Sequence, residues 1–143
     1  MTRTTQLYLK LVYDRLRALP FQVAMAGLAL VSGTTGLLHI GTATDSLTLL
    51  FPTWLVLGLN VTYIMSGVCM ILGLALPRRD VEGFGLVQLG AAVVVRGVAV
   101  ALVAGLNPDV LSLYTLYAMI LWACYQRLKA LFKAKAVATR AAK

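Results

Sequence analysis

Residues 54–76, WLVLGLNVTYIMSGVCMILGLAL, decide the fold of this chain. They lie inside a longer segment, residues 46–77, that contains no charged side chain. A helix needs about 20 mostly apolar residues to cross the hydrocarbon core of a bilayer, and this stretch is long enough. Its apolar residues do not alternate with period two, which disfavours a barrel strand, so a membrane-spanning helix is predicted.

Three further apolar stretches extend this pattern to both sides, at about residues 21–40, 84–106 and 110–126. The third span, 84–106, contains one charge, Arg96. Of all 143 residues, 60% are apolar and 13% are charged, whereas a soluble domain has about a quarter charged residues. A soluble globule of this composition would expose large apolar patches. The sequence therefore predicts an all-α, polytopic membrane protein with a four-helix transmembrane domain over residues 21–126.

The basic residues predict the topology of these spans. Four lie in residues 1–20, none in the first loop, two in the second loop, none in the third and six in residues 127–143, and Arg96 is the thirteenth. Cytoplasmic segments carry the excess of lysine and arginine. Both termini and the loop with Arg78 and Arg79 are therefore expected in the cytoplasm, at the bacterial cytoplasmic membrane or at a virion membrane.

The two ends of the chain are expected at the membrane surface. From Gln6 to Leu19, leucine and valine recur at helical spacing, which predicts an amphipathic interfacial helix within residues 1–20; the alternative is that the first span simply continues upstream of Pro20. The fourth helix is expected to extend to about residue 136 and then fray within a basic tail, residues 127–143. Attraction to anionic lipid headgroups explains this tail, and nucleic-acid binding is the alternative.

Arg96 is the candidate functional residue inside the membrane, because a charge near the middle of a span costs roughly 3 kcal/mol or more. The predicted spans contain no acidic residue that could neutralise it, and Asn60 is the neutral partner candidate. Two interpretations stay open. Arg96 lines a water-filled path or an oligomer contact, or it snorkels to the surface and has a structural role only.

Small residues at four-residue spacing are candidates for helix packing, since they let two backbones approach closely. They are Ala29, Ser32, Gly33 and Gly36 in the first span and Gly97, Ala101 and Gly105 in the third. The same pattern suits association between copies and close packing inside one monomer, and the sequence leaves both open.

The sequence contains no recognisable catalytic, cofactor-binding or metal-binding motif. His39 is the single histidine and lies at a span end, and Cys69 and Cys124 lack metal-ligand spacing. A phosphate-binding loop and a dinucleotide fingerprint are also missing. No enzymatic activity and no cofactor are expected.

Four short motifs in the middle of the chain resemble a known family: FPTW at 51–54, SGV at 66–68, LGL at 72–74 and VEGFGL at 81–86. They are similar to those of small four-span membrane proteins from tailed phages of actinobacteria, often labelled holins. In that family the second span opens with a proline and an aromatic residue, and the third opens with glutamate, glycine and leucine. The resemblance covers about residues 51–100, and Arg96 departs from it, because members often have an aromatic or neutral residue there.

This resemblance implies a viral protein that oligomerises in the cytoplasmic membrane and permeabilises it without catalysis. The alternative is a structural or accessory subunit of a larger membrane assembly, such as a virion membrane or a respiratory complex, which requires packing only. A small transporter or channel ranks below both, because it would need an ionisable pair at the midplane and only Arg96 is present.

Overall fold

The computed structural model describes residues 19–39, 50–76, 78–105 and 107–141, without the side chains of residue 109 and of residues 134–141. The predicted interfacial helix from Gln6 to Leu19 lies outside the described residues except for Leu19, and most of the first loop also lies outside them. In the described part, the helices are α2 (Pro20–Leu38), α4 (Thr53–Ala75), α5 (Arg79–Ala104) and α6 (Leu111–Ala141), with a short 3₁₀ helix, η1 (Pro108–Val110), before α6.

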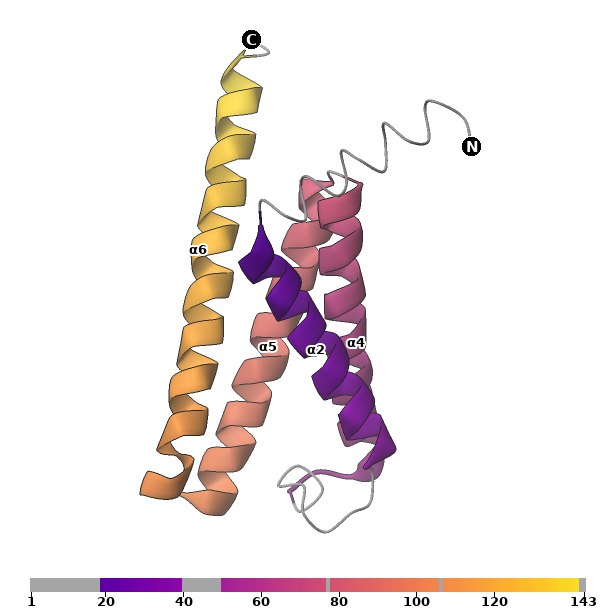
Figure 1. The fold of residues 1–143 in the computed structure, drawn as a ribbon, viewed down its shortest axis with the longest axis vertical. Coiled ribbons are helices and arrows are strands. Elements are labelled where there is room, and N and C mark those ends of the chain that lie inside the picture. The colour runs from indigo at the N-terminus through magenta and orange to yellow at the C-terminus, as the bar shows by residue number, and fades with distance from the viewer. Residues whose placement is uncertain (1–18, 40–49, 77, 106, 142–143) are drawn as a thin grey trace.

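The four long helices run alternately in opposite directions (Figure 1). The start of α2, the junction of α4 with α5 and the end of α6 lie toward one end of the bundle, and the junction of α5 with α6 lies at the other. Close packing joins each helix to the next along the chain, α2 with α4, α4 with α5 and α5 with α6. The described chain is therefore all-α, as predicted, and its helices pack in chain order from α2 to α6.

Three of the described helices, α2, α4 and α5, are long and apolar enough to cross a membrane. Their outer faces carry large exposed apolar side chains, such as Val31, Leu57 and Val87. Helices with this outer surface suit lipid as their solvent, so the chain is a membrane protein. α6 is not among these three helices, because tyrosines, Thr115, Gln126 and Arg127 interrupt its apolar residues. A fourth span therefore stays a prediction.

Two helix boundaries differ from those predicted. α5 begins at Arg79, five residues before the expected start of the third span, and Asp80 and Glu82 lie in its first turn. Acidic side chains at this position stabilise the positive end of a helix dipole. α6 continues unbroken to Ala141, so the predicted fraying near residue 136 is wrong, whereas the boundary at 126/127 between span and basic tail stays a prediction. Alanine, leucine and lysine predominate after Arg127, without glycine or proline, and these residues favour helix.

Small residues hold α2 tightly against α4. Gly33 and Gly36 are buried in this contact, and an added Cβ at Gly33 would lie 2.7 Å from the carbonyl oxygen of Asn60. An added Cβ at Gly36 would lie 2.6 Å from Cγ of Asn60 and closer still to its Oδ1. Ala29 is fully buried as well. Three of the four small residues expected in the first span therefore pack inside one chain. This agrees with close packing inside a monomer, one of the two uses that the sequence left open.

The contact between α4 and α5 is built in the same way. An added Cβ at Gly85 would lie 2.8 Å from the carbonyl oxygen of Ser66 and 2.9 Å from the backbone nitrogen of Met70. Ser66 is fully buried and donates its hydroxyl proton to the carbonyl of Tyr63, 2.7 Å away within its own helix. Hydroxyls satisfied in this way are tolerated in an apolar bundle.

Candidate functional site

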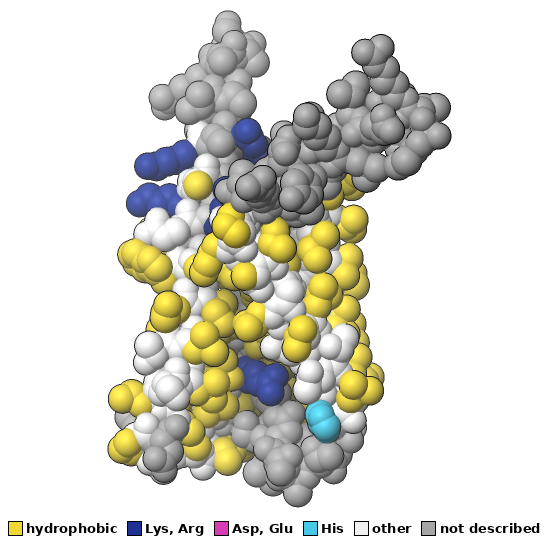
Figure 2. All heavy atoms as spheres, viewed as in Figure 1, with side chains coloured by type: hydrophobic (Ala, Val, Ile, Leu, Met, Phe, Trp, Pro, Cys, Tyr) yellow, Lys and Arg dark blue, Asp and Glu magenta, His cyan; other side chains and the backbone are white. Residues whose placement is uncertain are grey.

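A cavity of about 610 Å³ opens between α2 and α6, which do not pack closely against each other. α5 and one residue of α4 form its floor. Its apolar walls include Leu28 and Val31 from α2 and Leu113 and Leu116 from α6. Figure 2 shows this face of the molecule, where one dark-blue patch lies between two yellow and white columns of side chains. The bundle is therefore open along one side.

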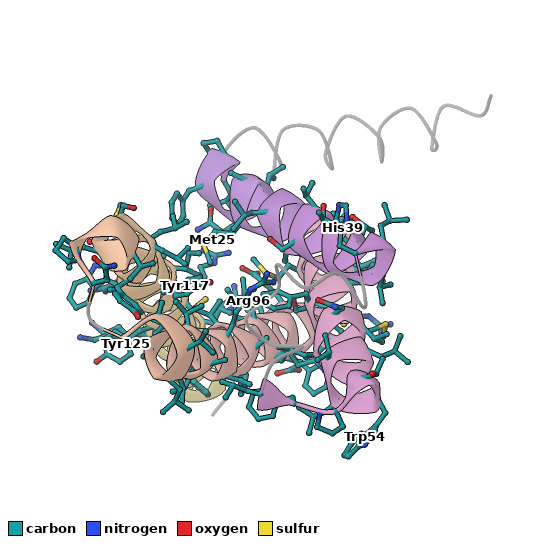
Figure 3. All side chains as sticks on the ribbon, turned by 90° about the horizontal axis from the view of Figure 1, so that it is seen from below. Met25, His39, Trp54, Arg96, Tyr117 and Tyr125 are labelled. Carbon is teal, nitrogen blue, oxygen red and sulfur yellow. The ribbon has the colours of Figure 1, made fainter. Side chains whose placement is uncertain are left out.

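Arg96 supplies the charge of this cavity. It lies on α5, half-buried, and Figure 3 shows it between α2, α4 and α5, with Tyr117 of α6 beside it. At 1.5 Å per residue, Arg96 is about 12 Å from the end of α5 at Ala104 and about 7 Å from the midpoint of that helix. It is thus within the apolar part of the bundle, in the half that leads to the α5–α6 junction.

Polar groups from three other helices line the same cavity. Ser32, Thr35 and His39 come from the α2 side, Tyr63 comes from α4 and Tyr117 from α6. His39 follows the last residue of α2, and its side chain is exposed at the same end of the bundle. The sequence singled out Arg96, Ser32 and His39 separately. The fold brings them to one cavity, because Arg96 on α5 lies opposite the C-terminal half of α2.

Asn60, the expected neutral partner of Arg96, does not pair with it. Asn60 is fully buried, and neither Oδ1 nor Nδ2 of its side chain has a hydrogen-bond partner among the described residues. The amide lies against the backbone of Gly36, which itself lines the cavity. The tight contact between α2 and α4 therefore places Asn60 behind the cavity wall, and the predicted pairing is wrong.

The small residues of the third span have three different surroundings. An added Cβ at Gly97 would lie 3.4 Å from the ring of Tyr117, so Gly97 faces α6. Ala101 is exposed on the surface of α5. Gly105 ends α5 with a positive φ of 64°, a conformation that favours glycine, and its carbonyl accepts a 2.7 Å hydrogen bond from the hydroxyl of Tyr114. Gly105 therefore shapes the α5–α6 turn.

An ion pair that the sequence analysis missed joins α5 to α6 at the other end of the bundle. Nε of Arg127 lies 2.6 Å from Oε1 of Glu82, and Nη2 of Arg127 lies 3.2 Å from Oε2. The Glu82 side chain is 5% exposed and that of Arg127 is 23% exposed. The two residues are 45 positions apart, but both were predicted near the cytoplasmic ends of their spans. The pair could have been predicted from the sequence, because Glu82 and Arg127 carry opposite charges and both were expected at the same end of the bundle.

A second, smaller cavity of about 290 Å³ lies beside this ion pair. Leu19, Gly73 and Arg79 contribute to its lining together with Glu82 and Arg127. Nε and Nη2 of Arg127 both donate to the carboxylate of Glu82. The charged groups of this cavity therefore pair with each other across the contact between α5 and α6.

The outer face of α6 carries an aromatic and cationic cluster. The rings of Trp122 and Tyr125 are 6.2 Å apart, and Nζ of Lys129 lies 5.9 Å from the centre of the Tyr125 ring. Trp122 is 64% exposed and Tyr125 is 56% exposed. Such side chains are enriched at the boundary between hydrocarbon and headgroups. Trp54, at the start of α4, is 71% exposed toward the opposite end of the bundle.

In the described part of the chain, no group of three or more histidine, cysteine, aspartate or glutamate side chains is arranged to hold a metal ion. Cys69 and Cys124 are both free thiols. The chemistry of the main cavity is therefore that of one guanidinium, hydroxyls and an imidazole in apolar surroundings, which suits binding of anions or water.

Comparison with known protein families, with curated proteins and with solved structures finds no match to this chain.

Proposed function

We propose that this chain is a non-catalytic integral protein of the bacterial cytoplasmic membrane that assembles with further copies of itself and permeabilises the bilayer. The observation that carries this proposal is the position of Arg96 in a cavity on the open side of the bundle. A charge within hydrocarbon costs roughly 3 kcal/mol or more. Covering this face with a second copy, or hydrating it in an assembly, removes Arg96 from contact with lipid tails.

The open face supplies the surface for such an assembly. Gly33 and Gly36 are buried against α4, and Ala29 is fully buried too, so these three residues are not free to meet a second copy. The walls formed by α2 and α6 are free of close packing with each other. When several copies turn this face inward, Arg96 and the polar groups near it line a path that water can enter.

The proposal includes four spans with both termini in the cytoplasm. In it, residues 111–126 of α6 form the fourth span, and the cluster of Trp122, Tyr125 and Lys129 lies at the cytoplasmic membrane surface. The basic remainder of α6 then contacts anionic headgroups, and the segment before Pro20 lies in the interface. The counts of lysine and arginine along the chain support this orientation.

Induced expression in a bacterium tests the proposal. We expect an abrupt loss of membrane potential and of respiration after the protein has accumulated, measured with a potential-sensitive dye and an oxygen electrode. Arg96→Leu should still insert but should change the time of the collapse or abolish it. Arg96→Lys keeps the charge and should behave like the wild type.

Val94→Leu is the matched control, because Val94 lies on the same helix with its side chain exposed on the outer surface. It should leave the collapse unchanged. Continued growth with abundant wild-type protein in the membrane would rule out permeabilisation. That outcome would favour the second candidate, an accessory subunit of a larger membrane assembly, since a self-packed bundle with one open side also suits a partner protein.

A further inference from the structure

The walls of the main cavity are apolar, but its floor is charged. The side chains of Leu28, Val31 and Leu116 form the mouth, and Arg96 lies between them on α5. A guanidinium has five N–H donors, so an occupant that matches both parts offers an anionic group to Arg96 and hydrocarbon to the mouth. Those are the two parts of an anionic membrane lipid.

The depth of Arg96 suits a lipid headgroup. With the midpoint of α5 at the bilayer centre, Arg96 lies about 7 Å from that centre along the helix, and the hydrocarbon boundary is about 15 Å away. An arginine side chain snorkels, so its charge reaches farther toward the surface than its Cα. Thr35 and His39 continue the polar lining in the same direction. A phosphate drawn slightly below the surface would meet all three.

The size of the cavity suits the phosphate end of a lipid and the neighbouring hydrocarbon better than a protein helix. Its volume of about 610 Å³ is in the range of small-molecule sites, about 300–1,000 Å³. A helix of about 10 Å diameter that crosses about 30 Å of hydrocarbon occupies on the order of 2,000 Å³. A helix can cover the opening but cannot fill the hollow beneath it.

From this combination we infer that the cavity between α2 and α6 binds one anionic phospholipid, with its phosphate on Arg96 and its acyl chains in the mouth between the two helices. The site does not depend on permeabilisation. If copies do assemble through this face, the lipid competes with the second copy or is enclosed by it.

The test measures lipids retained by the purified full-length protein. After extraction from vesicles with equal amounts of phosphatidylglycerol and phosphatidylcholine, native mass spectrometry should show a preference for phosphatidylglycerol of about fivefold, the ratio expected for one basic residue. Arg96→Gln should abolish the preference, and Arg96→Lys should keep it. Lys133→Gln, which removes one exposed charge from the part of α6 proposed to contact headgroups, should leave labelling of the cavity by a photoreactive phosphatidylglycerol unchanged.

A second pair of variants tests the mouth without altering charge. Leu116 lines the cavity, whereas Met119 on the same helix is 62% exposed and does not line it. Leu116→Trp should reduce retention of phosphatidylglycerol, and Met119→Trp should not. A phosphatidylglycerol carrying a photoreactive group should label peptides from residues 28–39 and 113–120.

Any of four results would overturn the inference, and the first three concern the lipid itself. They are equal retention of phosphatidylglycerol by the wild type and Arg96→Gln, photolabelling confined to residues 127–143, and displacement of the lipid by free glycerol phosphate, which would identify a site for soluble anions. Labelling of the cavity by an acidic helical peptide in preference to the lipid would also overturn it. Because the readout is bound lipid, a negative result here is distinct from a failure to collapse the membrane potential.

Discussion

Glu82 and Arg127 form a two-point ion pair, but they are unequally exposed. Glu82 is 5% exposed and Arg127 is 23% exposed, so only the arginine has access to water when its partner is lost. Breaking a buried pair is costly mainly because it leaves an uncompensated buried charge. The two single substitutions are therefore expected to differ.

We predict that Arg127→Gln lowers the free energy of unfolding by about 3 kcal/mol, because it leaves the buried carboxylate without its bidentate partner. Glu82→Gln should cost about 1 kcal/mol, since its amide oxygen still accepts a hydrogen bond from Arg127. Unfolding in mixed micelles, followed by circular dichroism, measures both. Lys133→Gln should have no effect, and equal losses in the two variants would contradict the argument.

The buried amide of Asn60 leads to the opposite expectation. An unsatisfied buried polar group costs about 1–3 kcal/mol, and an apolar side chain of similar shape avoids this cost. We predict that Asn60→Leu is neutral or raises the melting temperature, whereas Asn60→Asp lowers it sharply. Thermal unfolding in nanodiscs decides this. A marked loss of stability in Asn60→Leu would mean that the amide is satisfied by a buried water or a bound group.

At the residue scale, the sequence indicated which side chains are unusual but not what they contact. Arg96 was found because one charged residue within an apolar stretch is visible in the sequence, whatever that residue contacts in the fold. The surroundings of Asn60 and Glu82 depend on how closely α2, α4 and α5 approach each other. That approach is set by Gly36 and Gly85 meeting side chains and backbone distant in sequence, which a one-dimensional pattern does not specify.

The contact between α2 and α4 is the element-scale feature most sensitive to one methyl group. We predict that Gly36→Ala destabilises the bundle by about 1–3 kcal/mol, because the new Cβ would overlap the Asn60 side chain. Gly27→Ala on the same helix is the matched control, since no atom lies within 4 Å of its added Cβ. It should be neutral or stabilising by up to about 1 kcal/mol, as alanine favours helix.

Chemical unfolding of both variants in the same detergent compares them directly. Equal stability of Gly36→Ala and Gly27→Ala would show that the two helices are not packed as closely as described. A double variant, Gly36→Ala with Asn60→Ala, should recover much of the loss, because it removes the group that the new methyl meets.

The bounds of a helix were predictable where the local composition alone determines them. Charge-free runs predicted α2 and α4 to within two residues, because no competing signal exists in them. The start of α5 was placed too late, since Arg79 and Asp80 read as a polar turn although both are compatible with a first helical turn. The end of α6 was placed too early for a similar reason. Lysine and arginine end a membrane span without ending a helix.

At the scale of the whole molecule, the alternation of four helices predicts which residues face each side of the membrane. We expect Thr53→Cys, at the start of α4, to react with a membrane-impermeant maleimide in intact cells, and Lys133→Cys to react only after permeabilisation. Both are made in a Cys69→Ala, Cys124→Ala background, which removes the two native thiols. Labelling of Lys133→Cys from outside intact cells would reverse the orientation proposed above.

α6 is a straight rod of 31 residues, about 46 Å long, and the Glu82–Arg127 pair holds it near the middle. Tyr117, on the cavity wall, lies about 15 Å to one side of this pivot, and Ala141 lies about 21 Å to the other. If α6 tilts as a rigid body about this pair, a sideways displacement of the far end moves the wall the opposite way by about two-thirds as much. Spin labels at residues 28 and 116 would register this as a change in their separation. Binding of a partner or a lipid surface to the basic C-terminal part of α6 would then also change the width of the cavity mouth between α2 and α6.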